Sequence, residues 1–197
     1  DREHDMSISV PESIHKRVHK MYSKLYLWPV LHGLGPKVSS KDLEPFRKLL
    51  DKQMNIIADA LINVSQDKSG GSIYWVNDYT AISLVDKLRN HDKNSTIIYS
   101  FRTPFGADGV VPRIYQKDNH LMRGLFSADL ITFHRVVDMQ NFIEYSSSNF
   151  GSHLLGIKRS GKHRAYITLR SKHVVELFVI PEGNKRNYRK SLISSGE

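Results

Sequence analysis

Polar side chains that could contact a ligand follow several short apolar segments of this chain. Asp78, Arg102 and the pair His134-Arg135 each come directly after a run of β-branched and aromatic residues. A carboxylate can accept hydrogen bonds from sugar hydroxyls or act as a base, and a guanidinium offers a planar set of donors suited to phosphate. The alternative is structural: Asp78 could cap a following helix, and Arg102 could pair with a surface acid. If these side chains meet at one edge of a sheet, they indicate a site for a phosphorylated or polyhydroxy ligand.

The segments that precede Asp78 and Arg102 have the pattern of buried strands joined by a helix. Residues 72–76 and 96–100 are apolar and β-branched, whereas residues 80–90 carry apolar side chains at helical spacing. Two strands joined by a helix run parallel. Ligands of open α/β sheets bind at the carboxyl ends of such strands, so we expect Asp78 and Arg102 to share that edge.

The rest of the chain predicts an α/β protein. We expect further strands at residues 6–10, 129–133, 165–169 and 174–180, and helices at residues 12–25, 43–64, 120–126 and 136–150. Residues 27–36, rich in proline and glycine, are expected to form turns and not a helix, and Asp42 is expected to cap the helix after it. This order of elements predicts a doubly wound sheet with helices on both faces.

Composition limits the class of protein. With 197 residues, 40% hydrophobic and 25% charged, the chain suits one folded domain. The absence of cysteine excludes disulfides and cysteine-based metal or nucleophilic sites, which fits the cytoplasm. We expect no membrane segment and no metal site: His15 and His19 have suitable helical spacing but lie on a lysine-rich face.

The net charge of +9 is compatible with nucleic acid or with phosphorylated small substrates. No nucleic-acid-binding motif is present, so we do not expect a nucleic-acid partner. Motifs for dinucleotide binding, P-loops and serine hydrolases are also absent from the sequence.

Several segments resemble, in the same order, motifs of the trehalose-6-phosphate synthases of glycosyltransferase family 20. They are LWPVLH (27–32), WVNDY (75–79), SFRTPF (100–105), LMRGLFSADLITFH (121–134) and IPEG (180–183). The resemblance implies a glycosyltransferase with two facing Rossmann-like domains, the GT-B arrangement. Such an enzyme transfers glucose from UDP-glucose to glucose 6-phosphate with retention, and neither a metal nor a redox cofactor is implied.

By this resemblance, residues 1–183 correspond to most of the first, acceptor-side Rossmann-like domain, incomplete at its N-terminus. Residues 184–197 are a polar tail or the start of an interdomain linker. The implied partners are UDP-glucose, glucose 6-phosphate and a second, C-terminal Rossmann domain, while the oligomeric state is left open.

The same resemblance assigns candidate roles to individual residues. Asp78 and Tyr79, with Trp28 and His32, are expected to bind substrate, and Arg102 is expected to face the transferred glucose. Arg102 stands where the family has a histidine, and an arginine stays protonated in practice.

Other positions depart from the family pattern as well. Asn77 and Thr80 replace two histidines, and Gly33 replaces an aromatic residue. We therefore consider two functions: part of a synthase, inactive as this isolated half, or a non-catalytic regulatory or structural subunit of a trehalose-synthesising complex.

Overall fold

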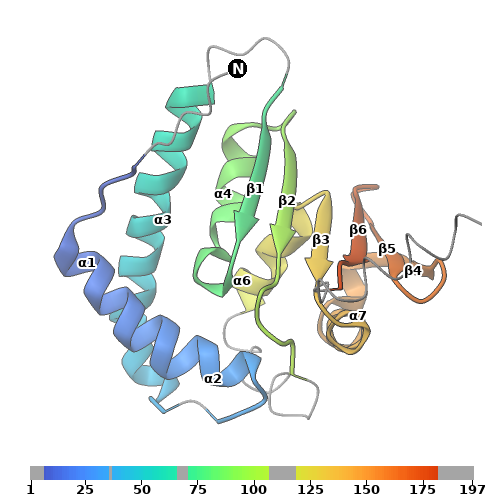
Figure 1. The fold of residues 1–197 in the computed structure, drawn as a ribbon, viewed down its shortest axis with the longest axis horizontal. Coiled ribbons are helices and arrows are strands. Elements are labelled where there is room, and N and C mark those ends of the chain that lie inside the picture. Colours follow the sequence, from blue (N-terminus) through green and yellow to red (C-terminus); the bar gives the residue numbers. More distant parts are fainter. Residues whose placement is uncertain (1–6, 36, 66–70, 107–118, 182–197) are drawn as a thin grey trace, which may run out of the picture.

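The protein folds around one mixed β-sheet, seen in a computed structural model that describes residues 7–35, 37–65, 71–106 and 119–181 (Figure 1). The sheet has six strands in the order β1-β2-β3-β6-β5-β4. Their bounds are β1 Ile73–Asn77, β2 Thr96–Ser100, β3 Leu130–Phe133, β4 Leu154–Arg159, β5 Arg164–Leu169 and β6 Val174–Val179. Strands β1, β2, β3 and β6 are parallel, whereas β5 and β4 are antiparallel to their neighbours. The predicted α/β class and the parallel pairing of β1 with β2 are confirmed.

One face of the sheet is buried under helices. These include α4 (Leu84–His91) and α7 (Val136–Phe150), with α3 (Glu44–Ser65) packed against α4. Side chains on this face, among them Tyr99, Ile131 and Leu177, are fully buried. Because side chains alternate between the faces of a strand, this burial explains the regular apolar pattern of the sequence.

The opposite face is partly open. Ile73 and Trp75 of β1 are 74% and 62% exposed, so β1 has one buried and one exposed side. The prediction of a buried strand at this position was therefore wrong, because only one face of β1 is covered in the described structure. Helices were expected on both faces, and the described helices leave this second face partly uncovered.

The N-terminal region is one continuous helix. It consists of α1 (Glu12–Arg17), a π-helical segment η1 (Val18–Leu27) and α2 (Trp28–Leu31), and the joining residues keep helical dihedral angles. The predicted turns at residues 27–36 were thus wrong up to Leu31. Pro29 is tolerated inside this helix because the carbonyl oxygen of Leu25, four residues earlier, accepts a 2.8 Å hydrogen bond from the N–H of Lys37 instead. Gly33, at φ 73°, then ends the helix in a conformation that favours glycine.

Two further predictions near the N-terminus were wrong. Residues 7–10 form no strand, since Val10 packs against the core without a neighbouring strand. Asp42 does not cap α3: it lies inside a 3₁₀ turn, η2 (Ser40–Leu43), and its N–H bonds to the carbonyl oxygen of Ser39.

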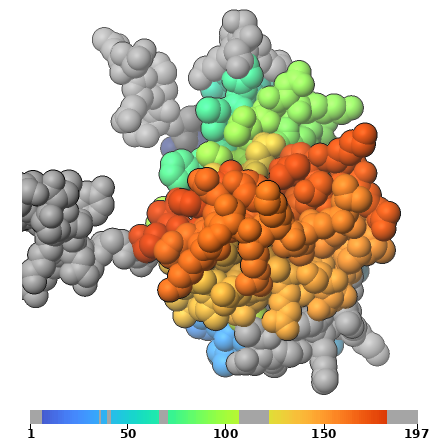
Figure 2. Space-filling view, turned by 90° about the vertical axis from the view of Figure 1, so that its right-hand side faces the viewer, coloured from blue at the N-terminus to red at the C-terminus, as the bar shows by residue number. Residues whose placement is uncertain are grey.

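The C-terminal half has the predicted helices and strands in the predicted order, with one additional strand, β4. A short helix α6 (Asn119–Gly124) and a 3₁₀ turn η4 (Leu125–Ser127) lead into β3, and another 3₁₀ turn, η5 (Gly151–His153), follows α7. Strand β4 was not predicted, because its residues are mostly exposed and its register shifts between Leu154 and Gly156. Figure 2 shows the surface formed by β4, β5 and β6, with α7 beside it. The predicted tail at residues 184–197 lies outside the described residues.

Candidate functional site

The polar residues singled out from the sequence lie at one edge of the sheet. Asp78 follows β1, Arg102 lies beyond the end of β2, and His134 follows β3. These strands are parallel neighbours, and Ser100 of β2 is paired with Asn77 on one side and Thr132 on the other. The predicted placement at the carboxyl edge is confirmed, and we refer to this edge as the carboxyl rim.

Asp78 has an unusual backbone conformation. Its φ of 77° and ψ of 150° lie in a region that is adopted almost exclusively by glycine. Holding another residue there costs about 1–3 kcal/mol. The carboxylate accepts a hydrogen bond of 2.6 Å from the backbone N–H of Tyr79, which starts a 3₁₀ turn, η3 (Tyr79–Ala81). The side chain thus caps this turn, as the structural alternative predicted, but a cap requires no strained backbone.

Buried tyrosines surround Asp78. The Tyr99 hydroxyl donates a 3.1 Å hydrogen bond to the carbonyl oxygen of Asp78. Burial raises the pKa of Tyr99 well above its ordinary value, and the negative charge of Asp78 raises it further. Burial, followed by the same charge, also raises the pKa of Tyr79. Both phenols therefore stay protonated beside the carboxylate at neutral pH.

The raised pKa of Tyr99 predicts a loss of stability in alkali. Above pH of about 10 the unfolded chain releases this proton while the folded chain keeps it, so the free energy of unfolding falls by about 1.4 kcal/mol per pH unit from this group. Tyr99→Phe should lack this contribution, although the lost hydrogen bond should cost about 1 kcal/mol at neutral pH. Both effects can be measured by urea unfolding at pH values of about 8, 10 and 11. Parallel pH profiles for the two proteins would contradict the prediction.

Arg102 projects from the carboxyl rim without a protein partner. It is exposed, and within the described ranges of the chain it makes no hydrogen bond or ion pair. The segment beyond it is fixed by α7: the N–H of Phe105 donates to Asp138 Oδ1 (2.9 Å), and the Phe105 carbonyl accepts from Asn141 Nδ2 (2.7 Å). A guanidinium on an anchored segment is available to an anionic ligand.

Arg135 does not share this property. Its Nε and Nη2 atoms donate to the carboxylate oxygens of Asp138 at 2.7 and 2.6 Å, and this hydrogen bonding raises the pKa of Arg135. Arg135 is therefore already paired, unlike Arg102, and His134 is half-buried at the end of β3. Sequence reasoning missed Asp138 and Asn141. The available signal was an acid three residues after Arg135, in the first turn of the helix that follows β3.

Trp28 and His32 lie together at the end of α2. Their rings stack with centroids 3.9 Å apart, and His32 Nδ1 is 2.7 Å from the carbonyl oxygen of Trp28. The neighbouring Leu31 carbonyl accepts a 2.8 Å hydrogen bond from Gly106, at the end of the segment that carries Arg102. At Gly106 a Cβ would come within 2.7 Å of the Gly33 nitrogen, so this close contact requires glycine. The segment η1 also packs against η3, which contains the buried Tyr79.

The described residues contain no group of three or more histidine, aspartate or glutamate side chains that could hold a metal ion. The same residues include no helix that is both long and apolar enough to cross a membrane.

A comparison with protein families shows which family has this sequence pattern. The model of the glycosyltransferase family 20 matches residues 2–181, nearly the whole chain. The chain belongs to glycosyltransferase family 20. A probable α,α-trehalose-phosphate synthase of Arabidopsis thaliana is 24% identical over 82% of the chain, and the corresponding synthase of Emericella nidulans is 27% identical over 73%. The chain spans 20% and 28% of the lengths of these relatives.

Solved structures show the same fold. A UDP-forming synthase from Burkholderia xenovorans, in complex with glucose 6-phosphate, has a TM-score of 0.69 at 20% identity, covering 94% of this chain and 39% of that one. The N-terminal domain of a trehalose-6-phosphate phosphatase from Candida albicans also scores 0.69, at 22% identity, over 85% of this chain and 32% of its own. The fold of family 20 is thus shared by proteins described as a synthase and as part of a phosphatase.

The family match agrees with the motif resemblance by which Asp78 and Arg102 were chosen as candidate site residues. The motif residues lie where the sheet brings them together. Gly33 supplies the positive φ that ends α2. Arg102 contributes a fixed positive charge at the carboxyl rim.

Proposed function

We propose that this chain forms the acceptor-side part of a trehalose-6-phosphate synthase-like glucosyltransferase, which moves glucose from UDP-glucose to glucose 6-phosphate with retention. The observation that carries the proposal is the strained Asp78 of a family 20 motif, at the same edge of the sheet as Arg102, which has no ion-pair partner among the described residues. Strained backbone that persists in a folded protein is concentrated at functional sites.

In this proposal Asp78 accepts hydrogen bonds from hydroxyls of the acceptor glucose. Arg102 faces the transferred glucose and supplies positive charge near the departing phosphate. Trp28 and His32 form a neighbouring wall, and Tyr79 holds the backbone of Asp78 in place. The names of the relatives support UDP as a product, and the Burkholderia structure contains glucose 6-phosphate.

The proposal extends to the longer protein. A second, C-terminal Rossmann domain would complete the donor site in a GT-B arrangement, and self-association or assembly with other subunits is compatible with it. No cofactor is required, because glycosyl transfer from an activated donor needs no redox chemistry. A chain without cysteine suits the reducing cytoplasm, which is the proposed location.

Binding of glucose 6-phosphate tests the role of Asp78. A ligand at about ten times its Kd stabilises a protein by roughly 1.4 kcal/mol, which for this chain length raises Tm by about 3–6 °C. We expect such a rise for the wild type and for Asp59→Asn, an exposed control on α3, but not for Asp78→Asn. Asparagine keeps an oxygen that can accept the Tyr79 hydrogen bond, so the variant should fold. Equal shifts in all three proteins would remove Asp78 from the site.

The isolated chain should not catalyse transfer. One Rossmann-like domain provides only one side of a cleft whose two sides must position donor and acceptor together. A coupled assay for UDP release, with UDP-glucose and glucose 6-phosphate, should therefore show no turnover above the buffer control. Turnover by the 197-residue chain would show that this chain holds a complete site.

A second candidate function is a non-catalytic subunit of a trehalose-synthesising complex. Arg102 favours it, because an arginine cannot exchange protons at neutral pH as a histidine can. The Candida albicans structure also supports it, since that similar domain is described as part of a phosphatase. Restoring histidine at position 102 in a two-domain protein distinguishes the candidates. A gain in UDP release favours a non-catalytic subunit, whereas a loss favours arginine adapted to catalysis.

A further inference from the structure

A cavity of about 600 Å³ lies on the helical side of the sheet, away from the carboxyl rim. Its lining residues are Asp86, Arg123, Gly124, Phe126, Ser127, Phe150, His153, Leu169, Arg170 and Ser171. Leu169 ends β5, next to the start of β6, and β6 runs parallel to β1, β2 and β3. The cavity therefore lies toward the amino ends of the parallel strands, whereas Asp78 and Arg102 lie beyond their carboxyl ends.

The cavity has an excess of positive charge. Neither Arg123 nor Arg170 forms an ion pair with any residue that the structure describes. Arg170 Nε donates to the Ser152 carbonyl oxygen (2.9 Å), which orients the guanidinium and leaves its terminal nitrogens available. The one acid among the described lining residues, Asp86, accepts hydrogen bonds from Ser127 Oγ (3.0 Å) and Asn90 Nδ2 (3.3 Å), so the lining sets two guanidinium groups against one carboxylate.

The apolar part of the wall is rigid. Phe126 and Phe150 are buried and pack edge to face with ring centroids 5.3 Å apart. Leu169, half-buried at the end of β5, extends this apolar surface. Buried rings that contact one another resist collapse into the cavity, so its volume is maintained without a ligand.

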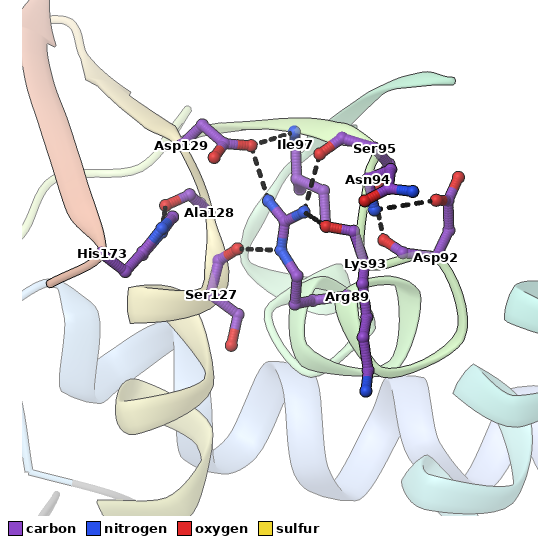
Figure 3. Close-up of polar contacts among 10 residues, drawn as sticks. All are labelled: Arg89, Asp92, Lys93, Asn94, Ser95, Ile97, Ser127, Ala128, Asp129 and His173. Atoms are coloured by element: carbon purple, nitrogen blue, oxygen red, sulfur yellow. Dashed lines mark hydrogen bonds and ion pairs between the residues drawn. The ribbon is translucent and has the colours of Figure 1, made fainter. Parts of the chain in front are cut away.

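The backbone beside the cavity is also fixed, as Figure 3 shows for the cluster around Arg89. Arg89 Nε donates to the Ser127 carbonyl oxygen (3.1 Å), and Nη2 donates to Asp129 Oδ2 (2.6 Å). The same Asp129 oxygen accepts from the N–H of Ile97 (2.7 Å) at the start of β2. These bonds join α4, η4 and the amino ends of two strands, so the segment that carries Ser127 is preorganised.

We propose that this cavity binds an organic phosphate, a monophosphate of a sugar or nucleoside, at a site separate from the carboxyl rim. The phosphate contacts the guanidinium groups of Arg123 and Arg170, whose planar donors match phosphate oxygens. The ring of the ligand lies against the wall formed by Phe126 and Phe150. Small-molecule sites commonly have volumes of about 300–1,000 Å³, and this cavity lies in that range, with its apolar wall beside a polar and charged one.

Titration of the 197-residue chain with three probes tests the proposal. Glucose 6-phosphate, uridine 5′-monophosphate and inorganic phosphate are added separately, with binding measured by calorimetry and by ¹H–¹⁵N NMR. We expect at least one organic phosphate to bind more tightly than inorganic phosphate and to shift the amide signals of Gly124, Ser127 and Ser171. Which of the two organic phosphates binds more tightly identifies the sugar or the nucleoside as the source.

Matched variants separate this cavity from other basic surfaces. In Arg123→Ala/Arg170→Ala the affinity should fall roughly tenfold or more, because charged hydrogen bonds are lost. Lys158→Ala/Arg159→Ala removes the same charge from exposed positions on β4 and should bind as the wild type does. Arg102→Ala should also leave the shifts at Gly124, Ser127 and Ser171 unchanged. The two mutated arginines are exposed, so the fold should persist, and Arg123→Lys/Arg170→Lys provides a charge-conserving variant of intermediate affinity.

Several results would overturn the proposal. They are a lack of signal shifts at the cavity with either organic phosphate, equal affinity for inorganic phosphate, and equal loss of affinity in the β4 control. Shifts at the cavity that disappear in Arg102→Ala would also overturn it, because they would make the cavity dependent on the carboxyl rim.

Discussion

Asp78→Gly is expected to be more stable than Asp78→Ala by about 1–2 kcal/mol, although glycine is the more flexible residue. Both variants lose the carboxylate and its hydrogen bond to Tyr79, so their difference isolates the backbone. At φ 77° alanine retains the strain of the wild type, whereas glycine adopts this conformation without it. Urea unfolding of the two variants measures the difference directly.

A control in a helix should give the opposite order. Asp59 is an exposed residue of α3, where glycine is less favourable than alanine by roughly 1 kcal/mol. If Asp78→Gly and Asp78→Ala were equally stable, or ordered as the Asp59 variants are, Asp78 would carry no backbone strain. If strain is confirmed and neither variant responds to glucose 6-phosphate, Asp78 combines a cost in stability with a role in binding. That combination is expected of a functional residue.

Asp138→Ala is expected to lower the free energy of unfolding by roughly 2–4 kcal/mol. Asp138 is 2% exposed, and its carboxylate joins the N–H of Phe105 to the guanidinium of Arg135. Alanine would leave the Phe105 N–H buried without its acceptor and would release the segment that carries Arg102. We therefore expect a weaker response to glucose 6-phosphate as well as a lower urea midpoint.

Three comparison variants define the origin of this effect. Glu144→Ala, at an exposed position of the same helix, should change the stability by less than about 0.5 kcal/mol. Arg135→Ala should cost less than Asp138→Ala, because the Arg135 side chain is 57% exposed and Asp138 keeps Phe105. Asp138→Asn retains an acceptor for Phe105 and should be intermediate. A loss in Arg135→Ala as large as that in Asp138→Ala would assign the effect to the ion pair and not to the anchored segment.

Much of the fold was predictable because its signals are local. The helix α7 begins and ends where its apolar spacing predicted, and β2, β3, β5 and β6 follow from short apolar runs bounded by polar residues. These patterns arise when one side of an element is buried, so they are strongest at the centre of the sheet. Of the two edge strands of the described sheet, β1 was predicted as a buried strand although one face is exposed, and β4 was not predicted.

The N-terminal helix shows where local rules fail. Proline and glycine between residues 27 and 36 indicated turns, yet the chain remains helical through Leu31. The physical reason is a contact outside the helix: the Leu25 carbonyl, four residues before Pro29, accepts a hydrogen bond from the N–H of Lys37, so the donor that proline lacks is replaced. Composition alone does not reveal such a contact.

By itself, the sequence determined the family, the parallel strands and the alignment of Asp78 with Arg102 at one edge of the sheet. These features depend on the order and spacing of residues, because parallel strands bring their carboxyl ends together whatever the details of packing. The tertiary structure alone decided which charges remain available. Arg135 pairs with Asp138, Arg102 has no partner among the described residues, and Asp78 is held in a strained conformation. The pair of Arg135 with Asp138 is local in the sequence. The anchoring of the Arg102 segment by Asp138 and the hydrogen bond from Tyr99 to the Asp78 carbonyl join elements distant in the sequence, which residue spacing does not encode.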